Sequence, residues 1–166
     1  YELGCSVVVN QVGRIPARDD APTSWSTLVD SLTEIGRFSQ QVGAWLAMET
    51  GPESGEDMAR LLRALPHGSV MVNFDPGNLI INGSSPVEAA RILGPDIIHV
   101  HAKDAVRDLA QGRGLEVPLG RGSADFPALL ATLEEHQYRG YLTVEREHGD
   151  RPQHEIGLAV QYLRNI

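Results

Sequence analysis

The chain has 166 residues and a formal net charge of −8, enough for one domain with its own core. Negative charge argues against binding to a phosphate backbone, which needs clustered Lys and Arg, so we expect no nucleic-acid partner. A single cysteine, Cys5, excludes an internal disulfide and favours a reducing, cytoplasmic location. No apolar run is long enough to span a membrane. An acidic surface fits a protein that acts on a small molecule but fits many other classes of protein too, and assembly into a homo-oligomer stays open.

Short apolar runs alternate with segments of helical periodicity along the whole chain. Continuous apolar runs are typical of strands buried on both faces, as in parallel sheets. The five predicted strands are Cys5 to Asn10, Ala44 to Glu49, Ser69 to Phe74, Asp96 to His101 and Tyr141 to Glu145. A helix is predicted after each strand, and four of these helices have recognisable inward-facing residues: Trp25, Leu28, Leu32 and Ile35; Met58, Leu61, Leu62 and Leu65; Leu129, Leu130 and Leu133; and Ile156, Ala159, Val160 and Leu163. The remaining helix is predicted to begin with Ser85 as its cap and Pro86 at its first position, and to end at Gly94.

The order is therefore strand–helix, five times. A unit of this kind takes roughly 30 residues in an eight-stranded (β/α)₈ barrel, so the length agrees with the count of runs. An open doubly wound sheet and a part of a closed barrel both accept this pattern, and periodicity does not choose between them. We find no linker and predict one domain over residues 1–166. The chain starts with Tyr1 rather than Met and leads almost directly into an apolar run, which is typical of the middle of a protein. A partial barrel would expose unpaired edges on its first and last strands, so in that case we expect either a piece of a longer product or a half that pairs with another chain.

Polar groups stand where four of the predicted strands end. Glu49, Asp75, His101 and Glu145 each occupy such a position. The carboxyl ends of parallel strands meet at one edge of a sheet, where the chemistry of such proteins takes place. A carboxylate buried there without a partner costs several kcal/mol, roughly, and one shared cation would satisfy all four groups. Three hard oxygens and one imidazole suit Mn²⁺ first, with Mg²⁺ or Co²⁺ also fitting and Zn²⁺ not excluded.

Other polar residues lie near this predicted site. His99, His101 and Lys103 share a face, because residues two apart in a strand point the same way. Asn78 follows Asp75 by three residues, where a loop can bring it to the same place.

Each feature also has a simpler interpretation. A single Glu is usually a solvated loop residue, and a strand His is usually a hydrogen-bonded core residue. Asp75 before Pro76 can build a turn, and Asp104 can cap the next segment. The Gly-rich stretch from Leu119 to Ser123 can bind a phosphate through its backbone amides, but a tight turn into a helix is favoured.

Five strings in order resemble a known family: LAMETGPES, VNFDPGNLI, HVHAKD, PLGRGSADFPALL and GYLTVERE. They are similar to the second half of the xylose-isomerase-like TIM barrels, a group of sugar isomerases, epimerases and dehydratases that also contains endonuclease IV. The resemblance implies an α/β fold, a partial (β/α)₈ TIM barrel with strands 4 to 8, strands 1 to 3 being absent. It also implies a metal held by Glu49, Asp75, His101 and Glu145, the set reached above.

The resemblance also bears on substrate contacts. Many members carry a His where this chain has Asn78, and often an Arg after the seventh strand, for which Arg113 or Arg121 is a possible equivalent. Asn78, His99 and Arg113 are the predicted substrate-binding residues. Strands 1 to 3, with their own contacts, are not in this sequence.

The function implied is a metal-dependent sugar isomerase or epimerase. Proton transfer next to a carbonyl would pass through an enediolate, and the substrate would be a sugar, a sugar phosphate or a related keto compound. Glu49 and Glu145 would move the proton, and Lys103 would stabilise the oxyanion or pair with Asp75 or Asp104. Loss of a hydroxyl from the same intermediate would give dehydration. A non-catalytic barrel module and, less favoured, a nuclease like endonuclease IV are the alternatives.

Overall fold

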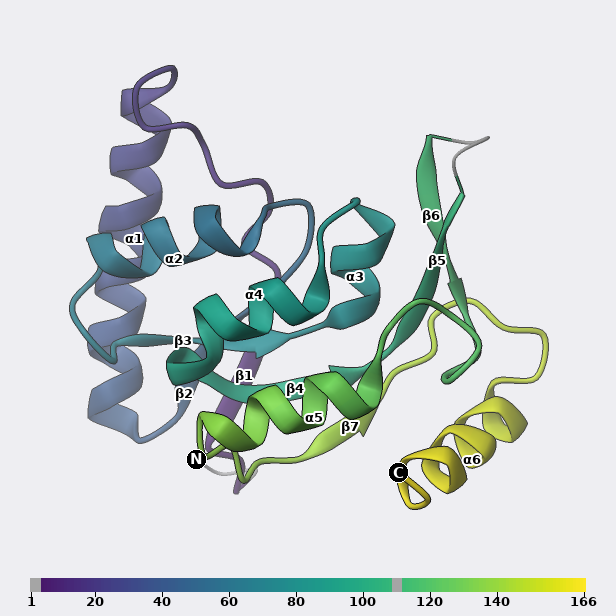
Figure 1. The fold of residues 1–166 in the computed structure, drawn as a ribbon. Helices are drawn as coiled ribbons and strands as arrows, with labels where there is room; N and C mark the ends of the chain where they lie inside the picture. The colour runs from purple at the N-terminus through teal and green to yellow at the C-terminus, as the bar shows by residue number, and fades with distance from the viewer. Residues whose placement is uncertain (1–3, 109–111) are drawn as a thin grey trace.

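Among the described residues, five parallel strands form one large sheet. The computed structural model describes residues 4–108 and 112–166. The strands β1 (Val7–Asn10), β2 (Trp45–Glu49), β3 (Val70–Phe74), β4 (Ile97–Ala102) and β7 (Leu142–Val144) lie side by side in that order. Every neighbouring pair is parallel, and helices lie outside the curled sheet (Figure 1). The architecture is a partial (β/α)₈ barrel and not the open doubly wound sheet that the sequence periodicity also allowed.

The helices begin and end at chemically marked positions. They are α1 (Pro22–Val42), α2 (Gly55–Ala64), α3 (Pro76–Ile81), α4 (Pro86–Leu93), the 3₁₀ turn η1 (Gly94–Asp96), α5 (Phe126–Glu135) and α6 (Pro152–Leu163). Ser54, Ser85 and Asp125 each accept a hydrogen bond from a backbone N–H in the first turn of α2, α4 and α5, as N-caps do. The cap at Ser85 and the predicted start at Pro86 are confirmed.

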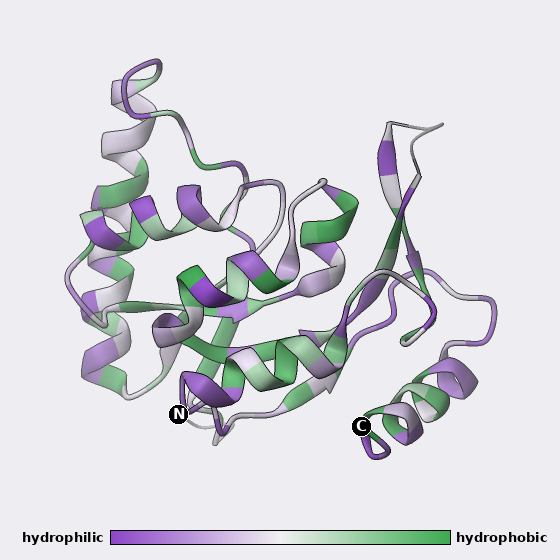
Figure 2. Ribbon diagram, viewed as in Figure 1, coloured by the Kyte–Doolittle hydropathy of each residue, from purple (hydrophilic) through white to green (hydrophobic). Residues whose placement is uncertain are grey.

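An apolar core fills the space between sheet and helices, and apolar residues concentrate on the inner sides of the elements (Figure 2). Met58, Leu61 and Leu133 are buried as predicted. The predictions of inward faces for Ile35 and Ile156 are wrong, because these side chains are 43% and 37% exposed. Helix α6 lies beside β7 at the edge of the sheet (Figure 1), where a helix has few neighbours to bury it.

Besides the short turn η1, a hairpin and a helix were not predicted. An antiparallel hairpin, β5 (Asp104–Asp108) paired with β6 (Arg113–Val117), follows β4, and it stands away from the sheet (Figure 1). Helix α3 begins directly after Asp75. Both lie in polar or very short segments that carry no strong periodicity. Among the described helices, none is long and apolar enough to cross a membrane.

Candidate metal centre

Four side chains from four adjacent strands converge at the carboxyl edge of the sheet. Glu49 is the last residue of β2, and His101 lies in β4. Asp75 follows β3 directly, and Glu145 follows β7 directly. One possible ligand atom from each lies within 4.8 Å of the others. The predicted set of ligands is therefore brought together in space.

The His101 ring stands at the centre of this cluster. Its Nδ1 atom lies 2.8 Å from Oε1 of Glu49, 3.2 Å from Oε2 of Glu145 and 3.8 Å from Oδ2 of Asp75. A single ring N–H cannot serve three carboxylates at once. Oδ2 of Asp75 and Oε2 of Glu145 are buried and lack an aligned hydrogen bond. Three carboxylates and one imidazole offer the oxygen and nitrogen ligands that divalent metals take in proteins, so the donor set fits such an ion.

The carboxylates set the protonation of the cluster. Burial lowers the pKa of the His101 imidazole, but hydrogen bonds with Asp75, Glu145 and Glu49 outweigh burial and raise it to about 11. The same contact with His101 lowers the pKa of Glu145 to about 2. Burial raises the pKa of the Asp75 carboxyl, and its contact with His101 offsets this in part. Without a cation, a proton on His101 therefore balances part of the negative charge.

Asp75 uses its two oxygens for two purposes. Oδ1 accepts a 2.8 Å hydrogen bond from the backbone N–H of Asn78 and caps α3, while Oδ2 faces the cluster. Thr50 fixes the backbone here, because its hydroxyl accepts from the Asp75 N–H at 2.8 Å and donates to the Asp75 carbonyl at 3.1 Å. The turn interpretation and the ligand interpretation of Asp75 are compatible. Sequence reasoning missed Thr50, which carried no signal beyond following Glu49.

Lys103 is a buried cation beside the cluster. Its side chain is 1% exposed, and Nζ lies 2.8 Å from Oε2 of Glu145 and 3.3 Å from Oδ2 of Asp75. Nζ also donates to Glu147, which was not predicted as a site residue. Burial lowers the pKa of the Lys103 ammonium, yet the charge of Asp75 and the hydrogen bonds to Glu145 and Glu147 raise it overall. The predicted ion pair with Asp75 is present.

The position of Lys103 depends on a glycine. A Cβ atom on Gly77 would lie 2.6 Å from Cγ of Lys103, which is closer than real contacts allow. The first turn of α3 and the lysine stem therefore pack against each other without a side chain between them.

Asp104 organises the Gly-rich loop. Its buried carboxylate accepts backbone hydrogen bonds from Ala105, Gly120, Gly122 and Ala124 at 2.8 to 3.0 Å. The amides of Gly120 and Gly122, which a bound phosphate would need, are therefore held by a side chain of the chain itself. The prediction of a tight turn into a helix agrees with this arrangement. Asp104 does not cap a helix, which corrects that expectation.

The predicted substrate contacts fall in two places. Asn78 and Arg113 line one cavity of about 310 Å³ together with Lys103 and Glu147, between α3, the hairpin and the segment after β7. His99 is not among the residues that line this cavity. Both of its ring nitrogens have hydrogen-bond partners, the Asn73 side chain at 2.7 Å and the Thr143 hydroxyl at 2.9 Å.

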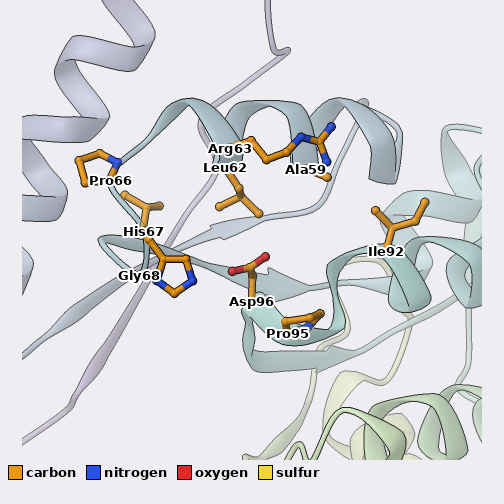
Figure 3. Close-up of a pocket in the computed structure, with 10 residues that line it drawn as sticks. Ala59, Leu62, Arg63, Pro66, His67, Gly68, Ile92, Pro95 and Asp96 are labelled. Carbon is orange, nitrogen blue, oxygen red and sulfur yellow. The ribbon is translucent and has the colours of Figure 1, made fainter.

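Another cavity, of about 220 Å³, lies at the opposite edge of the sheet. His67 and Asp96 line it (Figure 3). They precede β3 and β4, so this cavity is at the amino ends of the strands, away from the metal centre.

Comparisons with known proteins agree with this fold. The family model described as xylose isomerase-like TIM barrel matches residues 1–166. The chain belongs to the xylose isomerase-like TIM barrel family. An inosose dehydratase of Clostridium beijerinckii is 27% identical over 89% of this chain and 59% of its own length.

Solved structures of the family superpose on the chain. The xylose isomerase domain protein from Planctomyces limnophilus is 30% identical, with a TM-score of 0.90 over 98% of this chain and 60% of that one. The IOLI protein with a bound zinc atom is 19% identical, with a TM-score of 0.74 over 96% of this chain and 61% of that one, so this likeness concerns the fold alone. The chain spans about 60% of the length of such family members.

Proposed function

We propose that this chain carries the metal-binding part of an active site that removes a proton next to a carbonyl of a carbohydrate or a cyclic polyol ketone. The observation that supports it is the convergence of three carboxylates and one imidazole, whose possible ligand atoms all lie within 4.8 Å of one another. Glu49, Asp75, His101 and Glu145 would hold the cation. We expect Mn²⁺ first, since oxygen-rich sets suit hard divalent ions, with Mg²⁺, Co²⁺ or Zn²⁺ also compatible.

The chain's own groups would divide the chemistry among them. A divalent cation in this place supplies Lewis acidity toward a carbonyl oxygen. Lys103 would stabilise negative charge that develops on a substrate oxygen. Glu145 is 30% exposed, against 8% for Glu49, so Glu145 is the carboxylate that we assign to removing the substrate proton.

The cavity beside the cluster would hold the rest of the substrate. Asn78 and Arg113 offer hydrogen-bond donors on its wall, which suit the hydroxyl groups of a carbohydrate. No phosphate is required by this assignment, because the Gly-rich loop uses its amides on Asp104.

Two outcomes of the common proton-removal step are candidates. Dehydration, in which the β-hydroxyl leaves as water, is favoured by the likeness to an inosose dehydratase. Epimerisation or isomerisation, in which the proton returns to the other face or to the next carbon, is favoured by the second carboxylate, Glu49, in the cluster.

The experiment is a mass-spectrometric assay in D₂O. The Mn²⁺-loaded chain is incubated with an inosose and, separately, with a ketohexose. Loss of water supports dehydration, and deuterium incorporation without loss of water supports epimerisation or isomerisation. Glu145→Gln should abolish both signals, while Glu34→Gln, on the exposed side of α1, should keep them. Saturable Mn²⁺ binding without any exchange would favour the non-catalytic module, and full exchange in Glu145→Gln would refute the assignment.

A further inference from the structure

The orientation of Glu145 needs an explanation, because Glu145 lies beyond the end of its strand. Strand β7 has three residues, Leu142–Val144. The Glu145 backbone N–H donates to the Ala102 carbonyl oxygen at 3.3 Å, which extends the ladder by one step. The direction of the Glu145 side chain then depends on how the following residues are held.

One carboxylate from the hairpin holds the three residues that follow. Oε1 of Glu116 accepts from the backbone N–H of Glu147 at 3.1 Å, and Oε2 accepts from that of His148 at 2.8 Å. Oε1 also lies 2.9 Å from Nη1 of Arg146. Glu116 thus contacts Arg146, Glu147 and His148 in succession, as a clamp on the segment that leaves the metal centre.

This clamp is buried and tied to a further element. The Glu116 side chain is 3% exposed and that of Arg146 is 10% exposed. Arg146 also pairs through Nε with Glu155 of α6. A buried carboxylate is stable only when hydrogen-bond donors and a countercharge compensate its lost hydration. For Glu116, both the donors and the countercharge come from the segment that follows Glu145.

We propose that Glu116 is a positioning residue of the metal centre, which aims the Glu145 carboxylate at the cation by fixing the backbone of Arg146 to His148. The inference rests on the proposed function, because the cation is the one expected among Glu49, Asp75, His101 and Glu145. The hairpin thereby has a role in the site although it contributes none of the four ligands.

The test is a double-mutant cycle read by Mn²⁺ affinity. Isothermal titration with Mn²⁺ alone is carried out on the parent chain, Glu116→Ala, Glu116→Gln, Glu145→Gln and the Glu116→Ala/Glu145→Gln double variant. Changes in groups that orient a ligand typically weaken metal binding by about 10–100-fold. We expect Glu116→Ala to fall in that range and Glu116→Gln, which keeps one acceptor oxygen, to fall between it and the parent.

The cycle separates positioning from general stabilisation. If Glu116 acts through Glu145, Glu116→Ala has no further effect on Mn²⁺ affinity once Glu145→Gln is present. The control Glu34→Gln, on exposed α1 surface, should leave affinity unchanged. Circular dichroism confirms that each variant is folded at the titration temperature. Equal weakening in both backgrounds, or no weakening in Glu116→Ala, would overturn the proposal.

A second readout does not need the metal. The ¹⁵N chemical shifts of the His101 ring in the metal-free chain report its contact with Glu145, which lies 3.2 Å away. Glu116→Ala should shift them in the same direction as Glu145→Gln does. A parent chain that binds no Mn²⁺ refutes the proposed function, and in that case unchanged His101 shifts in Glu116→Ala would refute the positioning role separately.

Discussion

Loading of the metal centre should release a proton, because His101 must give up its proton to become a ligand. The three neighbouring carboxylates raise the pKa of His101 to about 11 in the metal-free chain, against 6.5 for an unperturbed imidazole. At pH 8, roughly three pH units below this pKa, removing the proton from His101 costs about 4 kcal/mol, at about 1.4 kcal/mol per unit. The apparent affinity for Mn²⁺ should rise about tenfold per pH unit between roughly pH 7 and 9.

Calorimetry in two buffers of different ionisation enthalpy counts the protons released, and we expect about one per Mn²⁺ bound. The stability of the metal-free chain should carry the matching signature. Since the folded pKa of His101 lies above its unfolded value, this contribution is fully present below about pH 6.5 and is lost as the pH rises through about 11. Affinity that stays flat between roughly pH 7 and 9, with no proton released, would refute the reasoning.

Three further predictions concern the surroundings of the centre. Asp104→Asn leaves two of the four backbone N–H groups facing the side-chain NH₂, which cannot accept a hydrogen bond, and should lower the free energy of unfolding by about 3 kcal/mol in urea titrations; a change below about 1 kcal/mol would contradict this. Gly77→Ala places a Cβ 2.6 Å from Cγ of Lys103, and should lower the free energy of unfolding by about 1–3 kcal/mol in urea titrations, whereas an unchanged free energy of unfolding would count against a role for this packing. Leu133→Ala removes most of a side chain that is only 3% exposed and leaves a cavity in the core. It should lower the free energy of unfolding by about 2–5 kcal/mol and leave the Mn²⁺ affinity unchanged below the melting temperature.

The strand ends were predictable because their signals are local. Glu49, Asp75 and His101 each follow or end a continuous apolar run, so the sequence places them at one edge of a parallel sheet. Their convergence could be inferred but the distances could not, because a shift of one residue in register would turn a side chain to the other face. Glu145 illustrates the limit: it was predicted as the last residue of its strand, which ends one residue earlier at Val144.

The hairpin and its contacts were beyond sequence reasoning. Residues such as Arg113 and Glu116 carry charges in a short segment, which is more typical of a loop than of a strand. Nothing local connects Glu116 with Arg146, thirty positions away, because their pairing depends on how the hairpin lies against the segment after β7. The same holds for Asp104, whose four backbone partners follow from loop geometry rather than from composition.

The central claim is that four side chains share one cation. Anomalous diffraction from crystals of the chain grown with Mn²⁺ tests it most directly. We expect one strong peak at the carboxyl edge of the sheet, with oxygens of Glu49, Asp75 and Glu145 and a nitrogen of His101 at about 2.0–2.4 Å. Manganese bound at some other place, or crystals in which these four groups surround no metal at saturating Mn²⁺, would contradict it.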